Sequence, residues 1–364
     1  MDKELNCIVI GNNTRHAKLF NYFCGTVYLA IDRKKSIQNR LSNDINEFKC
    51  ITVNNKTRLF KYVRRIHEIR KWTKLYGVDI IFTNTKFDLI CSKIACCRKK
   101  KKPLIICTFH NSLAWQNKNK VKLLSHLIDI CSDGCVCLSK EVYTELSKNI
   151  KKEKLLFQPN TIDCSGISRK TNYKIKNKHP IRIVYIATIY ENKNQLFALK
   201  VLNRLKRCFS VSIDFIGEIL NDNYYSMLIK FINDNNLGEN VCFKGSIDNC
   251  YLKNNLLYTY DLYFSPSLLE MSPLNILEAK ASGLPIVASH AFGQQDLLDN
   301  GFDGFLYEDG NEGDAFEKIS ILLKDEPTRR RIGENAYLNS TIKNNMFIAS
   351  EEMERFVKRL CKER

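Results

Sequence analysis

Short apolar runs alternate with helix-like segments along nearly the whole chain, and this alternation limits the possible folds more than any other feature. Most gaps between the runs carry helical periodicity, as in "NQLFALKVLNRLKR" at 194–207. Continuous apolar strands separated by helices are typical of parallel sheets that are covered on both faces. The sequence therefore predicts an α/β fold. The expected strands are 7–11, 26–31, 50–53, 78–84, 103–110, 134–139 and 154–160, then 181–188, 211–217, 241–245, 261–267, 285–290 and 304–308.

The alternation occurs in two sets, separated by a polar, basic stretch at 164–180 that has no apolar period. A chain of 364 residues is also longer than one core usually supports. We therefore predict an N-terminal domain at 1–165, a linker at 166–180, a second domain at 181–340 and a terminal amphipathic helix within 341–364. Ligands of such sheets bind at the carboxyl ends of the strands, and here we expect them in a cleft between the domains.

The net charge of +18 is concentrated in the N-terminal half, where residues 1–165 hold 31 Lys and Arg against 14 Asp and Glu. This asymmetry predicts a polyanionic partner for that half. The segment 59–76, "LFKYVRRIHEIRKWTKLY", and the run "RKKKK" at 98–102 form two basic patches. They indicate a face lying on an anionic membrane. For the apolar stripe of 59–76 alone, packing against its own sheet is favoured.

Several classes of protein fit the sequence poorly. The 15 cysteines are scattered, many within apolar runs, which favours reduced core thiols over disulfides or structural zinc. No run approaches the roughly 18 apolar residues of a membrane span, and the N-terminus lacks a secretory pattern, so we expect a cytoplasmic location. The first strand is not followed by GxGxxG, which argues against a dinucleotide oxidoreductase. A basic nucleic-acid-binding protein stays an alternative, although no binding module is recognisable.

Two glutamates, Glu270 and Glu278, lie eight residues apart in the otherwise apolar segment "SPSLLEMSPLNILEAKASGLP". A strand leads into Glu270, after which Ser272 and Pro273 are typical of an N-cap and a first-turn proline. The helix then ends near Gly283. A helix N-terminus binds phosphate readily, and the flanking carboxylates would accept hydrogen bonds from a sugar ring and a ribose. The alternative is a capping acid plus a helix-surface acid.

Four segments, in this order along the chain, resemble the retaining glycosyltransferases of family 4. The strand ending in His110 and the stretch from Gly134 to Asp163 match two of them. Lys193, in "YIATIYENKNQ", matches the lysine that grips the donor diphosphate. The fourth segment, 270–307, resembles the family's donor-site signature. Thr188 stands where the family usually has arginine.

This resemblance implies the GT-B architecture: two Rossmann-like domains whose parallel sheets face across a cleft, and a terminal helix that crosses back to the first domain. It implies a nucleotide-sugar donor, UDP-sugar in preference to GDP-sugar. Asn160 and Asp163 are typical turn formers. The site residues that we carry over are His110, Lys193 and Glu270 as catalytic, and Thr188, Lys193, Ser272, Leu274, Asn275 and Glu278 as donor-binding.

The chemistry expected of these residues is hexosyl transfer. Departure of a diphosphate builds negative charge, which Lys193 and the amides of Met271–Asn275 would stabilise; neither a metal nor a cofactor is required. Retention of configuration is carried over from the family. We expect a membrane-held, lipid-linked saccharide acceptor in O-antigen, capsule or lipopolysaccharide synthesis, on the inner face of the cell membrane. A GT-B sugar-nucleotide epimerase is the alternative enzyme.

Overall fold

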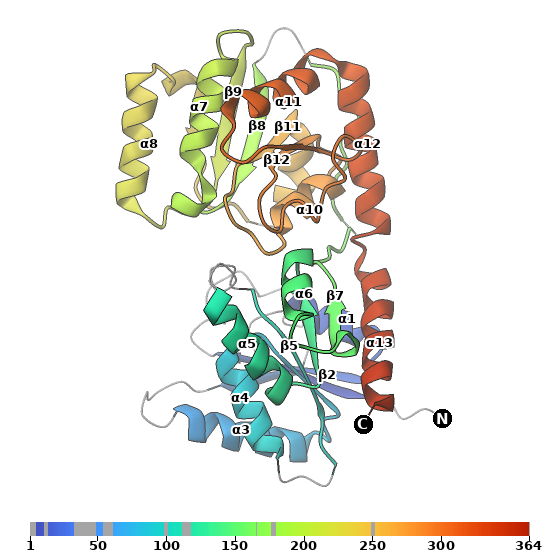
Figure 1. Ribbon diagram of the computed structural model, residues 1–364. Coiled ribbons are helices and arrows are strands. Elements are labelled where there is room, and N and C mark those ends of the chain that lie inside the picture. The colour runs from blue at the N-terminus through green and yellow to red at the C-terminus, as the bar shows by residue number, and fades with distance from the viewer. Residues whose placement is uncertain are drawn as a thin grey trace. The chain divides into compact units, whose positions relative to one another are not determined.

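The computed structural model describes residues 5–10, 14–32, 49–53, 61–97, 101–110, 118–164, 166–175, 180–248 and 252–363. The chain forms two compact units (Figure 1): Met1–Pro159 with Met346–Arg364, and Asn160–Asn345. The predicted domain boundaries differ from these, because residues from Asn160 onward belong to the second unit. Lys170 Nζ, for example, donates to Tyr260 O at 2.7 Å. Most of the predicted linker is therefore a packed segment, and its residues 176–179 lie outside the described residues.

The first unit contains a seven-stranded parallel sheet in the order β3-β2-β1-β4-β5-β6-β7. Its strands are β1 (Asn6–Ile10), β2 (Thr26–Asp32), β3 (Lys49–Val53), β4 (Ile80–Thr83), β5 (Leu104–Thr108), β6 (Gly134–Cys137) and β7 (Leu155–Phe157). Its helices are α1 (Thr14–Asn21), α3 (Lys61–Leu75), α4 (Lys86–Cys96), α5 (Lys118–Cys131), α6 (Lys140–Leu146) and α13 (Met346–Lys362).

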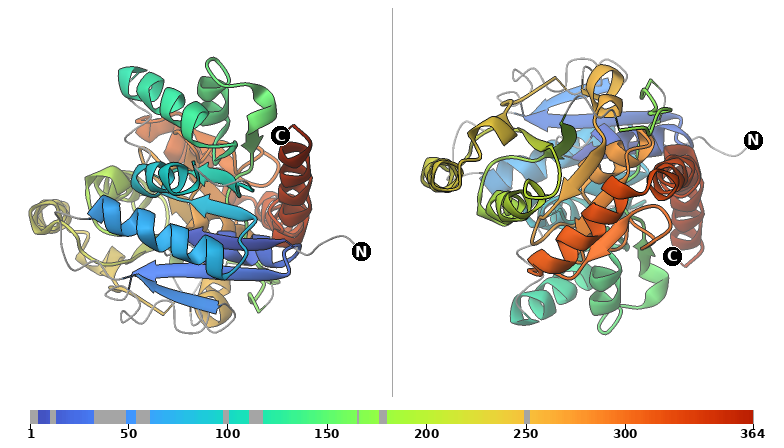
Figure 2. Two further views of the ribbon diagram at one scale, coloured as in Figure 1. Left: turned by 90° about the horizontal axis from the view of Figure 1, so that it is seen from below. Right: turned by 90° about the horizontal axis from the view of Figure 1, so that it is seen from above.

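Alternate residues of the strands pack on opposite faces of this sheet, as the two-residue period of a strand requires. Cys7 and Val9 of β1 join a core cluster with Phe356 of α13. The neighbouring residues Ile8 and Ile10 join another cluster, with α3 and α4. Helices α1 and α13 therefore cover one face and α3 and α4 the other (Figures 1 and 2). The thirteen cysteines whose side chains the structure describes are free, and most are buried, in agreement with core thiols.

Most of the basic segment at 59–76 forms helix α3; Tyr76 follows the helix, and Leu59 and Phe60 lie outside the described residues. Ile69 and Trp72 are buried in the core, whereas most of the basic side chains are exposed. The apolar stripe therefore packs against its own sheet, and the surface of α3 is chiefly basic. Arg98–Lys100 of the second basic run also lie outside the described residues.

The second unit contains a six-stranded parallel sheet in the order β10-β9-β8-β11-β12-β13. The strands are β8 (Ile181–Ile186), β9 (Val211–Ile216), β10 (Val241–Phe243), β11 (Leu262–Ser265), β12 (Ile286–Ser289) and β13 (Phe305–Tyr307). The helices are α7 (Gln195–Leu205), α8 (Asp222–Asp234), α10 (Leu274–Ala281), α11 (Glu312–Lys324) and α12 (Glu326–Ile342).

Every predicted strand corresponds to an observed one, so the prediction of two Rossmann-like domains with parallel sheets is confirmed. Strand order reverses between β1 and β4 in the first sheet and between β8 and β11 in the second. At such a reversal the two loops leave in opposite directions and open a crevice at the carboxyl ends of the strands. Within the described residues, no helix has the length and apolarity of a membrane span.

Candidate active site

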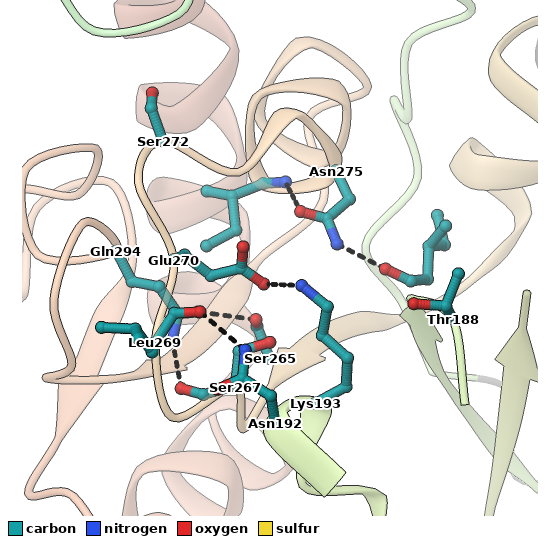
Figure 3. Close-up of polar contacts among 12 residues, drawn as sticks. Thr188, Asn192, Lys193, Ser265, Ser267, Leu269, Glu270, Ser272, Asn275 and Gln294 are labelled. Carbon is teal, nitrogen blue, oxygen red and sulfur yellow. Dashed lines mark hydrogen bonds and ion pairs between the residues drawn. The ribbon is translucent and has the colours of Figure 1, made fainter. Parts of the chain in front are cut away.

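Lys193 and Glu270 meet at the strand-order reversal of the second unit (Figure 3). Lys193 lies in the loop after β8, in a short 3₁₀ turn, and Glu270 lies in the loop after β11. Asn194, with φ of 55°, provides the left-handed step that turns the chain into α7. Lys193 Nζ pairs with Glu270 Oε1, and the two side chains are only 16% and 14% exposed. The structure thus brings together two residues that are 77 positions apart.

The two loops are bound to each other beside this ion pair. Tyr185, in β8, donates its hydroxyl to Lys193 O at 2.8 Å and shares a 2.6 Å hydrogen bond with Ser267 Oγ. Asn192 Nδ2 donates to Leu269 O at 2.9 Å. Since most of these groups have little access to water, the hydrogen bonds fix the position of the ion pair.

A third segment, the loop after β12, packs against the backbone around Glu270. Gln294 accepts from Ser265 Oγ at 2.6 Å and donates to Ser267 O at 2.7 Å. Gly293 has φ of 79°, and a Cβ there would lie 2.2 Å from Glu270 O. Only glycine permits so close an approach in this conformation. The backbone around Glu270 is therefore held from two sides.

The N-cap prediction for Ser272 was wrong. Pro273 is the N-cap of α10 and has no side-chain capping bond. Ser272 Oγ instead accepts the backbone N–H of Asn160 at 2.9 Å. Leu274 and Asn275 form the first turn, as predicted, and Asn275 Nδ2 donates to Ile186 O at the end of β8. The N–H of Ile276 donates to Asn275 Oδ1 at 3.0 Å. The first turn of a helix, at the positive end of its dipole, favours an anion.

The remaining predicted donor-site residues lie around this centre. Glu278 is in the second turn of α10 and is 7% exposed. Burial raises the pKa of the Tyr263 hydroxyl in β11, and the charges of Glu278 and Glu270 raise it further. Thr188 is half-buried, and its carbonyl accepts Gln195 Nε2 at 2.9 Å.

His110 belongs to the first unit, where it follows β5 and is exposed. Its ring meets the ring of His16 edge-on at 5.6 Å between centroids, and His16 stacks on Phe82 at 4.6 Å. No role for His16 is predicted from the sequence. The sequence contains one indication of this contact: both histidines follow predicted strands, and the carboxyl ends of parallel strands lie at the same edge of a sheet. No cluster of three or more potential metal ligands occurs among the residues that the structure describes.

Two family descriptions match the chain. Residues 168–339 match the glycosyl transferases of group 1, and residues 26–165 match glycosyltransferase family 4. Together these matches cover most of the sequence. The chain belongs to glycosyltransferase family 4. It is therefore a glycosyltransferase, as the resemblance implied.

Individual relatives agree with this family. The family 4 chain is 26% identical over 314 residues to the Escherichia coli UDP-Gal:alpha-D-GlcNAc-diphosphoundecaprenol alpha-1,3-galactosyltransferase, across 81% of this chain and 79% of that protein. It is 41% identical over 81 residues, 22% of each protein, to the Campylobacter jejuni N,N'-diacetylbacillosaminyl-diphospho-undecaprenol alpha-1,3-N-acetylgalactosaminyltransferase.

Among solved structures, Anabaena HepE in complex with UDP and glucose superposes with a TM-score of 0.79 at 16% identity, over 98% of this chain and all of that one. Cyanobacterial sucrose-phosphate synthase from Thermosynechococcus elongatus gives the same TM-score at 14% identity, over 99% of this chain and all of that one. These similarities confirm the predicted GT-B fold.

Proposed function

We propose that this protein is a retaining, metal-independent hexosyltransferase that moves a sugar from a nucleotide-sugar donor to a lipid-linked saccharide in surface polysaccharide synthesis. The observation that carries the proposal is the Lys193–Glu270 pair beside the N-terminus of α10. It combines a cation, a helix N-terminus and a carboxylate at the strand-order reversal of the sheet, where α/β folds bind nucleotides.

The chemistry of the leaving group explains the cation and the amides. Breaking the bond between an anomeric carbon and a diphosphate leaves negative charge on the phosphate oxygens. Lys193 and the first-turn amides of α10 are held rigidly beside one another, so they would stabilise this charge without rearranging. Glu270 would then accept hydrogen bonds from sugar hydroxyls, and Glu278 from the ribose.

Retention of configuration requires the acceptor to attack the face from which the diphosphate leaves. In the proposed mechanism a leaving phosphate oxygen takes the proton of the acceptor hydroxyl, the new glycosidic bond forms, and the nucleoside diphosphate departs. No side chain need act as nucleophile. His110 is proposed to contact the transferred sugar.

The relatives support UDP-sugar in preference to GDP-sugar as donor and a lipid diphosphate as carrier of the acceptor. The E. coli relative is named for UDP-galactose and a diphosphoundecaprenol acceptor, the C. jejuni relative for a diphospho-undecaprenol acceptor, and the HepE crystals hold UDP. An O-antigen, capsule or lipopolysaccharide pathway would follow from such an acceptor.

The direct test is thermal stabilisation of the purified protein by a panel of UDP- and GDP-sugars. A donor at 100 times its Kd should add about 2.7 kcal/mol to the free energy of unfolding, which raises Tm measurably. We expect UDP and at least one UDP-sugar to stabilise the protein. If neither nucleotide class raises Tm, the donor site is wrongly assigned. If the protein converts the nucleotide sugar to its epimer without an acceptor, the epimerase alternative is correct.

A basic helical layer in the first unit supports peripheral attachment to an anionic membrane. Helices α3, α4 and α5 neighbour one another in sequence order. Together they carry eleven Lys and Arg against three Asp and Glu. Apolar side chains are exposed among these charges, with Val63, Ile94 and Leu123 at 67%, 43% and 71%. Basic charge mixed with exposed apolar groups is the chemistry that binds an anionic lipid surface.

Removing charge from this layer should release the protein from anionic vesicles. Each lysine near the surface contributes about 1 kcal/mol, so replacing Lys71, Lys74 and Lys93 with glutamine should weaken binding by about two orders of magnitude. Co-sedimentation with phosphatidylglycerol vesicles measures this, and phosphatidylcholine vesicles should bind neither protein. The matched control replaces the exposed Lys200, Lys230 and Lys324 of the second unit. Equal loss in both triple variants would show that the layer is not the docking surface.

A further inference from the structure

Asn160, the first residue of the second unit, is joined by two hydrogen bonds to the loop between β11 and α10, which contains Glu270. Its backbone N–H donates to Ser272 Oγ at 2.9 Å, and its side-chain Nδ2 donates to Ser272 O at 2.6 Å. Each residue therefore uses its side chain to bind the other's backbone. Ser272 is only 5% exposed, so water competes little for these groups.

These bonds complete the support of the Glu270 turn. The N–H of Glu270 donates to Phe292 O at 3.0 Å, which holds the turn at its start. Asn160 holds it two residues later, at Ser272, just before Pro273 caps α10. The carboxylate of Glu270 and the first-turn amides of α10 therefore share a backbone that is fixed at both ends.

The segment at Asn344, where the chain leaves the second unit, is bound to the C-terminal end of α10. Ile162, two residues after Asn160, donates its N–H to Asn344 O at 3.0 Å. Asn344 Oδ1 in turn accepts Lys280 Nζ at 3.4 Å. The two segments through which the chain passes between the units are thus bonded to each other and to opposite ends of α10.

We propose that Asn160 is a positioning residue for the nucleotide-sugar donor, acting through Ser272. It holds the Glu270 turn and the first turn of α10 in the orientation that receives the diphosphate. This inference rests on the proposed function. The sequence favours a local turn former at Asn160, but a turn former bonds its neighbours, whereas Nδ2 of Asn160 reaches a residue 112 positions away.

The test compares Asn160→Ala with Asn240→Ala. The control removes the same kind of bond in the same unit, because Asn240 Nδ2 donates to Val211 O at 2.8 Å. Val211 lies at the amino end of β9, whereas Lys193 and Glu270 follow the carboxyl ends of β8 and β11. From the net free energy of one such hydrogen bond, we expect Asn160→Ala to raise the Kd for UDP about tenfold. Asn160→Asp, which keeps the shape but lacks the Nδ2 donor, should bind UDP no better than Asn160→Ala. Asn240→Ala should leave this Kd unchanged.

Calorimetric titration with UDP, and Tm without ligand, separate the outcomes. If the stabilisation panel shows that the protein binds GDP, GDP replaces UDP in these titrations. A purely structural role would lower Tm in both alanine variants and leave the Kd of each unchanged, which would overturn the inference while the proposed function stands. If the wild-type protein itself binds neither nucleotide, the proposed function and this inference fall together. A raised Kd in both Asn160 variants, with the control unaffected, supports the positioning role.

Discussion

Replacing Lys193 with alanine should reduce sugar transfer by at least about 10²-fold, the loss typical when one preorganised charge-stabilising donor is removed. The side chain is the cation that the structure pairs with Glu270. Without it, the donor diphosphate would face the carboxylates of Glu270 and Glu278 with only the amides of α10 to offset its charge. Initial rates of transfer, with the donor concentration varied, measure the loss as kcat/KM.

Three companion variants separate catalysis from stability. Lys200→Ala removes an exposed lysine of α7, paired with Glu312, and should keep full activity. Lys193→Arg keeps the charge but presents a planar fork in place of a compact ammonium, so we expect partial activity. The double variant Lys193→Ala with Glu270→Gln leaves no unpaired half-buried charge; it should regain stability but not transfer. Full activity in Lys193→Ala would show that the donor site lies elsewhere.

The fold could be predicted from the sequence because its determinants are local. A run such as "IRIVYI" at 181–186 is apolar at nearly every position and rich in β-branched residues, which is typical of a strand covered on both faces. The helix at 194–207 carries its own periodicity. These signals place all thirteen strands without knowledge of how distant segments meet.

The site could be predicted only in part, because its finer contacts join segments that are far apart in sequence. Resemblance located Lys193 and Glu270, but their ion pair depends on β8 and β11 being neighbours. The local pattern around Ser272 is a correct N-cap pattern. In the structure the N-cap is one residue later, at Pro273, and the serine hydroxyl accepts the N–H of Asn160, 112 residues away. The edge contact of His16 with His110 likewise depends on sheet order.

Lys280 illustrates the same limit and gives the largest expected change in stability. Lysine side chains are usually exposed, but Lys280, which lies in an apolar segment, is only 1% exposed within the second unit. Its Nζ donates to Leu297 O at 2.7 Å and pairs with Asp303 at 2.9 Å. Burial lowers the pKa of Lys280, and the charge of Asp303 opposes this shift. The carboxylate of Asp303 thus offsets part of the cost of burying this lysine.

Lys280→Met should therefore destabilise the protein by about 3–5 kcal/mol, because it leaves the carboxylate of Asp303, itself 1% exposed, without its cation. For a unit of this size Tm should fall by roughly 6–20 °C, measured by calorimetry. Lys343→Met is the matched control, since Lys343 pairs with Asp299 but both side chains are more than half exposed. It should cost less than about 1 kcal/mol.

The combination of Lys280→Met with Asp303→Asn decides between a buried charge and simple loss of packing. Asparagine retains an oxygen for the N–H of Asp299, which donates to Asp303 Oδ1 at 2.7 Å, and carries no charge. If the uncompensated carboxylate causes the destabilisation, the double variant should recover much of the lost Tm. If the double variant is no more stable than Lys280→Met, the loss comes from packing. A single variant with the Tm of the Lys343→Met control would mean that the buried pair contributes little, and α10 would owe its position to apolar contacts and the Asn160–Ser272 bonds instead.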